Sequence, residues 1–131
     1  MTERPLSPHL SVYRMRRYTL LTSITNRATG LALSAGLVLL AYWLVAIASG
    51  PVAYRRASGV LSLGVLKVVY AILLATFSYH LFAGIRHLIW DTGRGIEREQ
   101  AKRSSLLLAL VSLVAFIGLA WWALHATGRA P

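Results

Sequence analysis

Cysteine and acidic side chains are scarce in this sequence. The 131 residues include no cysteine and only four aspartates and glutamates. Without thiols, the chain can form neither a disulfide bond nor a thiolate metal site of its own. No acidic residue lies inside a long apolar run. This weighs against a proton-coupled exporter, because such proteins normally need an intramembrane carboxylate.

Charge of either sign is also missing from two long stretches, residues 28–54 and 104–128. Each exceeds the roughly 20 apolar residues that cross a bilayer core. A third run, residues 68–85, is slightly short, but the flexible Lys67 can extend its ammonium group to the interface and so lengthen the usable span. A spanning segment must satisfy its own backbone groups, and none of these runs alternates like a strand, so all three predict helices. We therefore expect an all-α integral membrane bundle of three transmembrane helices.

The predicted organisation is an arm on the inner surface, a transmembrane domain and an outer tail. The expected bounds are 1–22 for the arm, 23–125 for the domain, with helices at about 23–49, 60–90 and 104–125, and 126–131 for the tail. Pro5 and Pro8 disfavour a continuous helix in the arm. Three helices leave little room to enclose a ligand, so we expect a partner chain.

The formal net charge is +10, and its distribution predicts the orientation. Basic residues precede the first helix and lie around the end of the second: Arg4, Arg14, Arg16, Arg17 and Arg27, then Arg86, Arg94, Arg98, Lys102 and Arg103. The first connection has only Arg55 and Arg56. The positive-inside rule then places the N-terminus and the second connection in the cytoplasm or the mitochondrial matrix. Because these charges flank apolar runs rather than share one folded face, they indicate a lipid bilayer and no nucleic acid.

His80 is the residue that most directly indicates a function. Counted back from Arg86 at the expected membrane border, it lies about 9 Å deeper at the helical rise. An ionisable side chain at that depth is costly and usually serves an ion path, a proton relay or a cofactor. An imidazole is a good axial ligand for haem iron, and Gly84, one turn away, would let a flat macrocycle approach the backbone. The alternative is a hydrogen bond that merely joins helices.

No second histidine is expected at the depth of His80. His9 lies in the arm, His87 near the inner border and His125 near the outer end of the third helix. If haem iron has two histidine ligands, the second would come from another subunit or from a second copy of this chain.

Ser23 and Arg27 lie one turn apart at the start of the first helix, so both project from one face at the inner interface. The simpler interpretation is a helix cap and a positive-inside arginine. The alternative is a polar pocket for a headgroup or a propionate, since a guanidinium offers several fixed donors.

Three segments together resemble the cytochrome b subunit of succinate dehydrogenase, the larger membrane anchor of respiratory complex II. They are Arg4-Pro5-Leu6-Ser7-Pro8-His9-Leu10-Ser11-Val12-Tyr13, Ser23-Ile24-Thr25-Asn26-Arg27-Ala28-Thr29-Gly30, and His80 to Asp91 with its Gly84-Ile85-Arg86-His87 core. The likeness covers almost the whole chain. It implies a subunit that is not catalytic alone, one b-type haem, ubiquinone as substrate, and three partners: a flavoprotein, an iron–sulfur subunit and a second membrane anchor.

The resemblance also implies roles for individual residues. His80 would be an axial ligand of the haem iron, with the second ligand on the companion anchor. Ser23 and Arg27 would line the quinone site, and Arg27 would also reach a haem propionate. Many relatives have histidine before this arginine, whereas this chain has Asn26, which can donate a hydrogen bond but cannot carry a proton or a positive charge.

We therefore expect a haem b-binding anchor of succinate:ubiquinone oxidoreductase, in a bacterial cytoplasmic membrane rather than a mitochondrial inner membrane. Two alternatives stay open at this point. One is a homodimeric b-type cytochrome in which each copy contributes His80. The other is a structural or transport membrane protein without haem.

Overall fold

The structure of the chain, a computed structural model, describes residues 17–127. Four helices make up nearly all of this part: α1 (Arg17–Ala48), α2 (Pro51–Leu61), α3 (Gly64–Asp91) and α4 (Arg98–Thr127). No strand occurs among the described residues. The predicted all-α fold class is confirmed.

Three of the helices are long and apolar enough to cross a membrane: Tyr18–Ala48, Gly64–Asp91 and Arg98–Ala126. This agrees with the three predicted spans. Two of them begin earlier than expected, α1 at Arg17 rather than near residue 23 and α4 at Arg98 rather than near residue 104. The extension of α4 carries basic side chains that can reach water at a membrane surface, so a helix can continue there without burying charge.

The sequence did not predict α2. The first span does end at Gly50-Pro51, as expected, where Gly50 has a φ of 97° that favours glycine. The chain then starts a new helix, because Pro51 occupies its first turn, where a missing N–H costs nothing. The Tyr70 hydroxyl donates to the Leu61 carbonyl (3.0 Å) and ties the end of α2 to α3.

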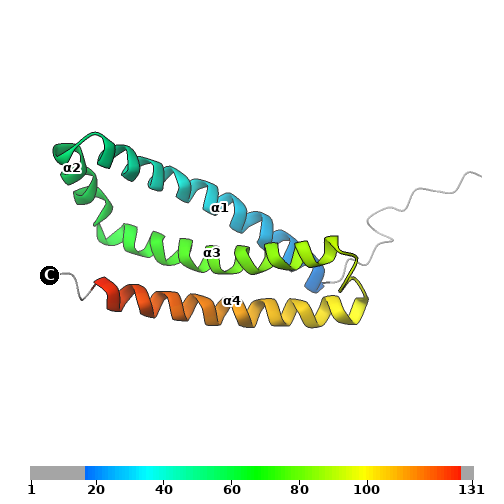
Figure 1. Ribbon diagram of the computed structural model, residues 1–131. Coiled ribbons are helices and arrows are strands. Elements are labelled where there is room, and N and C mark those ends of the chain that lie inside the picture. The colour runs from blue at the N-terminus through cyan, green and yellow to red at the C-terminus, as the bar shows by residue number, and fades with distance from the viewer. Residues whose placement is uncertain (1–16, 128–131) are drawn as a thin grey trace, which may run out of the picture.

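The three long helices are not parallel along their whole length (Figure 1). Helices α3 and α4 run antiparallel side by side, while α1 lies close to α3 at its start and diverges from it towards α2. The start of α1, the end of α3 and the start of α4 therefore meet at one end of the bundle. If the positive-inside prediction holds, this is the inner end.

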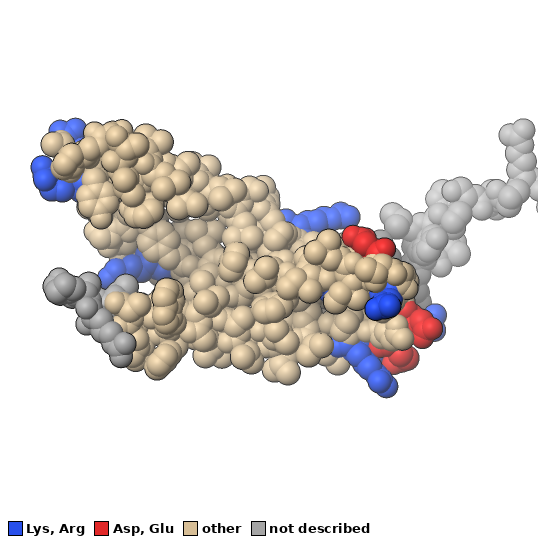
Figure 2. Space-filling view, viewed as in Figure 1, with Lys and Arg blue, Asp and Glu red and all other residues tan. Residues whose placement is uncertain are grey.

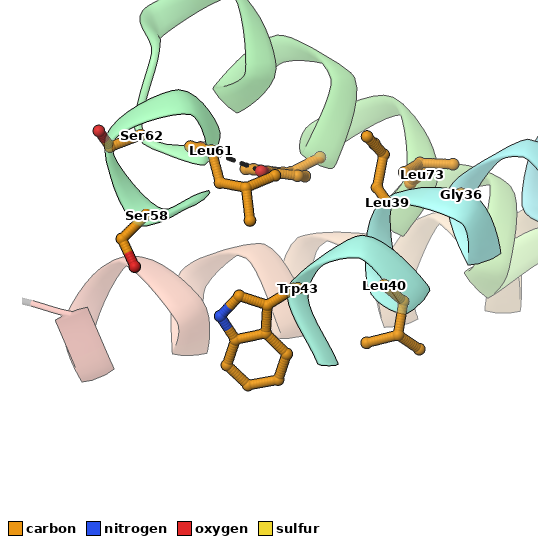
Figure 3. A pocket seen from close by; sticks show the side chains of 9 residues that line it. Gly36, Leu39, Leu40, Trp43, Ser58, Leu61, Ser62 and Leu73 are labelled. Carbon is orange, nitrogen blue, oxygen red and sulfur yellow. Dashed lines mark hydrogen bonds between the residues drawn. The ribbon is translucent and has the colours of Figure 1, made fainter. Parts of the chain in front are cut away.

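An open, largely apolar groove of about 530 Å³ fills the space where α1 and α3 diverge. It is lined by Gly36, Leu39, Leu40, Trp43, Ser58, Leu61, Ser62, Tyr70 and Leu73 (Figure 3). At the edge of this groove, a Cβ on Gly36 would lie 2.8 Å from Leu73 Cδ2. Any larger residue at position 36 would therefore require the Leu73 side chain to move.

The distribution of side chains is the reverse of that in a water-soluble protein. Apart from Leu108, the buried residues are small or polar: Ala46, Ala57, Thr76, Ser78, Ala83, Arg86, Ser105 and Ser112. Large aliphatic and aromatic side chains lie exposed along all the long helices. Charged residues gather at the two ends of the molecule, and its middle carries none on the face shown (Figure 2). Small residues at helix contacts and apolar side chains outside are typical of helices that pack within lipid.

Candidate functional site

His80 lies on α3 at its contact with α1. Its side chain is partly buried, and its Nδ1 is 3.1 Å from the Thr29 hydroxyl of α1. Its Nε2 makes no hydrogen bond to any described residue. One ring nitrogen is therefore engaged by the protein, and the other is available to a ligand.

One glycine, on α1, lies against this imidazole, and another lies one turn along α3. A Cβ on Gly30 of α1 would lie 3.1 Å from His80 Cε1, closer than such atoms normally approach, so the ring packs against the α1 backbone. A Cβ on Gly84, one turn along α3, would meet nothing within 4 Å. The position beside Gly84 is therefore open within the described part of the chain. The part played by Gly30 was not foreseen.

The other described histidines bond to their own helices. His87 Nδ1 donates to the Ala83 carbonyl (2.7 Å), and His125 Nδ1 donates to the Trp121 carbonyl (2.8 Å). His9 lies outside the described residues. Within residues 17–127, no group of three or more histidine, cysteine or acidic side chains could hold a metal ion. Like His80, both His87 and His125 leave Nε2 without a hydrogen bond to a described residue, but both are exposed, whereas His80 is partly buried at the α1–α3 contact.

Ser23 and Arg27 lie on α1 one turn apart. Ser23 is partly exposed and Arg27 is exposed. Neither side chain makes a hydrogen bond or an ion pair with another described residue. The serine hydroxyl and the guanidinium are thus both free to bind a group from outside the described part of this chain.

Arg86, unlike Arg27, is buried and bonded within the chain. The sequence had indicated only a charge at the membrane border. Its side chain is 6% exposed. It donates to Ser104 Oγ (2.9 Å), to Ser105 Oγ (2.9 Å) and to the Ala101 carbonyl (3.0 Å), all on α4. A weaker bond reaches Thr22 Oγ1 on α1 (3.4 Å). Four of the five guanidinium N–H groups are therefore satisfied by neutral oxygens of the protein.

The contact around Arg86 extends to two aromatic side chains of α3. The guanidinium carbon lies 3.9 Å from the centre of the Trp90 ring, which is cation–π geometry. The Trp90 indole in turn donates to the Gly95 carbonyl in the α3–α4 connection (3.0 Å). Tyr79 donates to the Thr22 carbonyl (3.2 Å) and joins α3 to α1. The spacing of Arg86 and Trp90, four residues apart, is the one signal in the sequence that could have indicated this cluster.

Comparison with known proteins decides the family. A sequence profile of the succinate dehydrogenase/fumarate reductase transmembrane subunit matches residues 1–119. The chain belongs to this family. The succinate dehydrogenase cytochrome b556 subunit of Paracoccus denitrificans is 42% identical over 120 residues, which cover 86% of this chain and 92% of that protein. The mitochondrial cytochrome b560 subunit of Sus scrofa is 34% identical over 121 residues, covering 91% and 71%. The cytochrome b556 subunit of Rickettsia felis is 37% identical over 112 residues, covering 86% of each chain.

These matches confirm the resemblance seen in the sequence, to the cytochrome b subunit of succinate dehydrogenase. Together with the three membrane-spanning helices, they identify a membrane subunit of an enzyme complex.

Proposed function

We propose that this chain is the haem b-binding membrane anchor of a succinate:ubiquinone oxidoreductase and forms part of its quinone-reduction site. The observation that carries the proposal is the state of His80, a partly buried imidazole in a membrane span with Nδ1 engaged by Thr29 and Nε2 free. An engaged Nδ1 and a free Nε2 suit an axial iron ligand, and among the described histidines only His80 combines them with partial burial at a helix contact. The names of the relatives, which are cytochrome b subunits, support it.

The described residues would contact a haem on one of its faces, through a single axial ligand. His80 would supply one axial nitrogen, and the open position beside Gly84 would leave room for a flat ring. A second axial ligand would come from a companion anchor subunit. A haem bound here would supply a one-electron carrier between the helices. Arg27, exposed near the same end of the bundle as the α1–α3 contact, is the candidate for a propionate.

Ser23 and Arg27 would bind the headgroup of ubiquinone at the inner end. Succinate is oxidised on the flavoprotein subunit, and electrons arrive through the iron–sulfur subunit. Reduction of the quinone takes up two electrons and two protons. The Ser23 hydroxyl would hold one quinone oxygen by a hydrogen bond. The fixed positive charge of Arg27 would stabilise negative charge that develops on the headgroup before protonation is complete.

The proposed location is a bacterial cytoplasmic membrane, with the inner end of the bundle facing the cytoplasm. The relatives from Paracoccus and Rickettsia are bacterial, whereas the one from Sus scrofa is mitochondrial. The arm that precedes α1 would contribute to binding the soluble subunits. It lies outside the described residues, so this remains a prediction from Pro5, Pro8 and the basic residues around them.

The test is deletion of this chain from cells that otherwise express the complex. We expect membranes to lose succinate:ubiquinone reductase activity and a b-type reduced-minus-oxidised spectrum. Succinate oxidation by an artificial soluble acceptor should persist in the soluble fraction, because the flavoprotein remains. Re-expression should restore all three properties. Unchanged quinone reductase activity in the deletion strain would contradict the proposal, and a purified haem protein without flavoprotein and iron–sulfur subunits would favour the homodimeric cytochrome instead.

A further inference from the structure

The Thr29 hydroxyl lies across the helix contact from His80, within hydrogen-bond distance of the Nδ1 atom of that imidazole. Thr29 Oγ1 is 2.9 Å from the Asn26 carbonyl, to which it donates, and 3.1 Å from His80 Nδ1. A hydroxyl has one hydrogen and two lone pairs. When the hydroxyl donates its hydrogen to the Asn26 carbonyl, it can only accept from the ring. In that arrangement His80 carries its proton on Nδ1, and the Nε2 lone pair is free.

The orientation of the ring is restricted as well as its protonation. Gly30, the residue after Thr29, leaves room for the ring at a place where any Cβ would lie 3.1 Å from His80 Cε1. The bond to Thr29 and the contact with Gly30 act on neighbouring atoms of the same edge of the imidazole. A side chain at residue 30 would press on the ring next to its bond with Thr29. The glycine therefore leaves room for the arrangement in which His80 bonds to Thr29.

We propose that Thr29 is a positioning residue for haem binding, which fixes His80 as the Nδ1–H tautomer with Nε2 directed to the iron. This rests on the proposed function, in which His80 is an axial ligand. An imidazole whose other N–H donates a hydrogen bond is a more basic ligand, and such outer partners typically change metal affinity 10–100-fold. A more basic ligand stabilises the ferric form over the ferrous form. Thr29 therefore strengthens haem binding and lowers its midpoint potential.

The test compares Thr29→Val, Thr29→Ser and wild type in the assembled complex. Valine keeps the branched shape but cannot accept the bond, whereas serine keeps the hydroxyl. We expect Thr29→Val to weaken haem retention about 10–100-fold in a competition with a haem-binding apoprotein. The haem that remains should have a raised midpoint potential in redox titration. Thr29→Ser should resemble wild type in both measurements.

Two further variants separate this inference from the proposed function. Thr19→Val makes the same substitution at an exposed threonine of α1 and should change neither quantity. His80→Leu should abolish the normal haem spectrum. If His80→Leu does so while Thr29→Val leaves the potential and the retention unchanged, the role of Thr29 is refuted and the proposed function stands. If His80→Leu has no effect on the spectrum, both the role of Thr29 and the proposed function are refuted. A Thr29→Val complex that assembles poorly but keeps the wild-type potential would also refute the positioning role.

Discussion

Arg86 and Arg27 lie near the same end of the bundle, on different helices, and the chain uses them in opposite ways. Arg86 is 6% exposed and donates to α4 and α1 while stacking on Trp90. Arg27 is exposed and bonds to no described residue. The first guanidinium is satisfied within the chain and holds three helices together, whereas the second is available to a bound group. Arg27 is therefore the better candidate of the two for binding a group from outside the described part of the chain.

The largest expected effect is that of Arg86→Ala. It removes four hydrogen bonds, each worth about 0.6 kcal/mol within a membrane, and a cation–π contact of about 1 kcal/mol. We expect a loss of roughly 3 kcal/mol of stability, seen as a lower unfolding temperature and yield of the detergent-solubilised complex. Haem content and quinone reduction should fall together. Normal stability with a selective loss of quinone reduction would instead place Arg86 in the quinone site and remove the contrast with Arg27.

Arg27→Ala should leave the fold intact and impair the chemistry. Removing a donor that stabilises developing negative charge typically lowers turnover about 100-fold, and we expect that loss in succinate:ubiquinone reductase activity. Assays with an artificial soluble acceptor and the unfolding temperature should match wild type. The control is Arg55→Ala, an exposed arginine in α2 at the other end of the bundle. An equal loss in Arg55→Ala would show that positive charge in general, rather than Arg27, supports the reaction.

Ser23→Ala should have a smaller effect of the same kind. It removes one neutral hydrogen bond to a quinone oxygen, worth about 1 kcal/mol or roughly fivefold in rate. The expected result is a raised KM for ubiquinone with unchanged activity towards the artificial acceptor. Wild-type kinetics in this variant would exclude Ser23 from the site.

The smallest effect is expected for Asn26→Ala. Asn26 Oδ1 is buried and has no hydrogen-bond partner within the described part of the chain. Its removal therefore breaks no bond, and an unsatisfied buried acceptor is itself unfavourable. We expect stability to change by less than about 1 kcal/mol and quinone reduction to stay within about twofold of wild type. A loss as large as that of Arg27→Ala would show that the amide bonds to the haem or to a partner subunit.

The sequence predicted the spanning helices well because the membrane imposes one simple requirement, a long uncharged run. It missed α2, where Arg55 and Arg56 break the apolar pattern, and it set the start of α4 too late because residues 98–103 are charged. The sequence could not predict which side chains of different helices contact each other. Helices α1 and α3 are apolar on every face, so no stripe indicates which side of one meets the other. The partners of His80 and Arg86, which lie on neighbouring helices, needed the structure. The assignments of His80, Ser23 and Arg27 remain predictions.

The role of His80 is tested most directly by reduced-minus-oxidised absorption spectra of purified complexes that carry His80→Leu or His87→Leu. His87 is the matched control, because it lies on the same helix, is exposed, and bonds to the carbonyl of Ala83. We predict that His80→Leu loses or severely alters the b-type spectrum, while His87→Leu keeps it unchanged. An unaltered spectrum in His80→Leu would contradict the assignment of this chain as a haem ligand donor through His80.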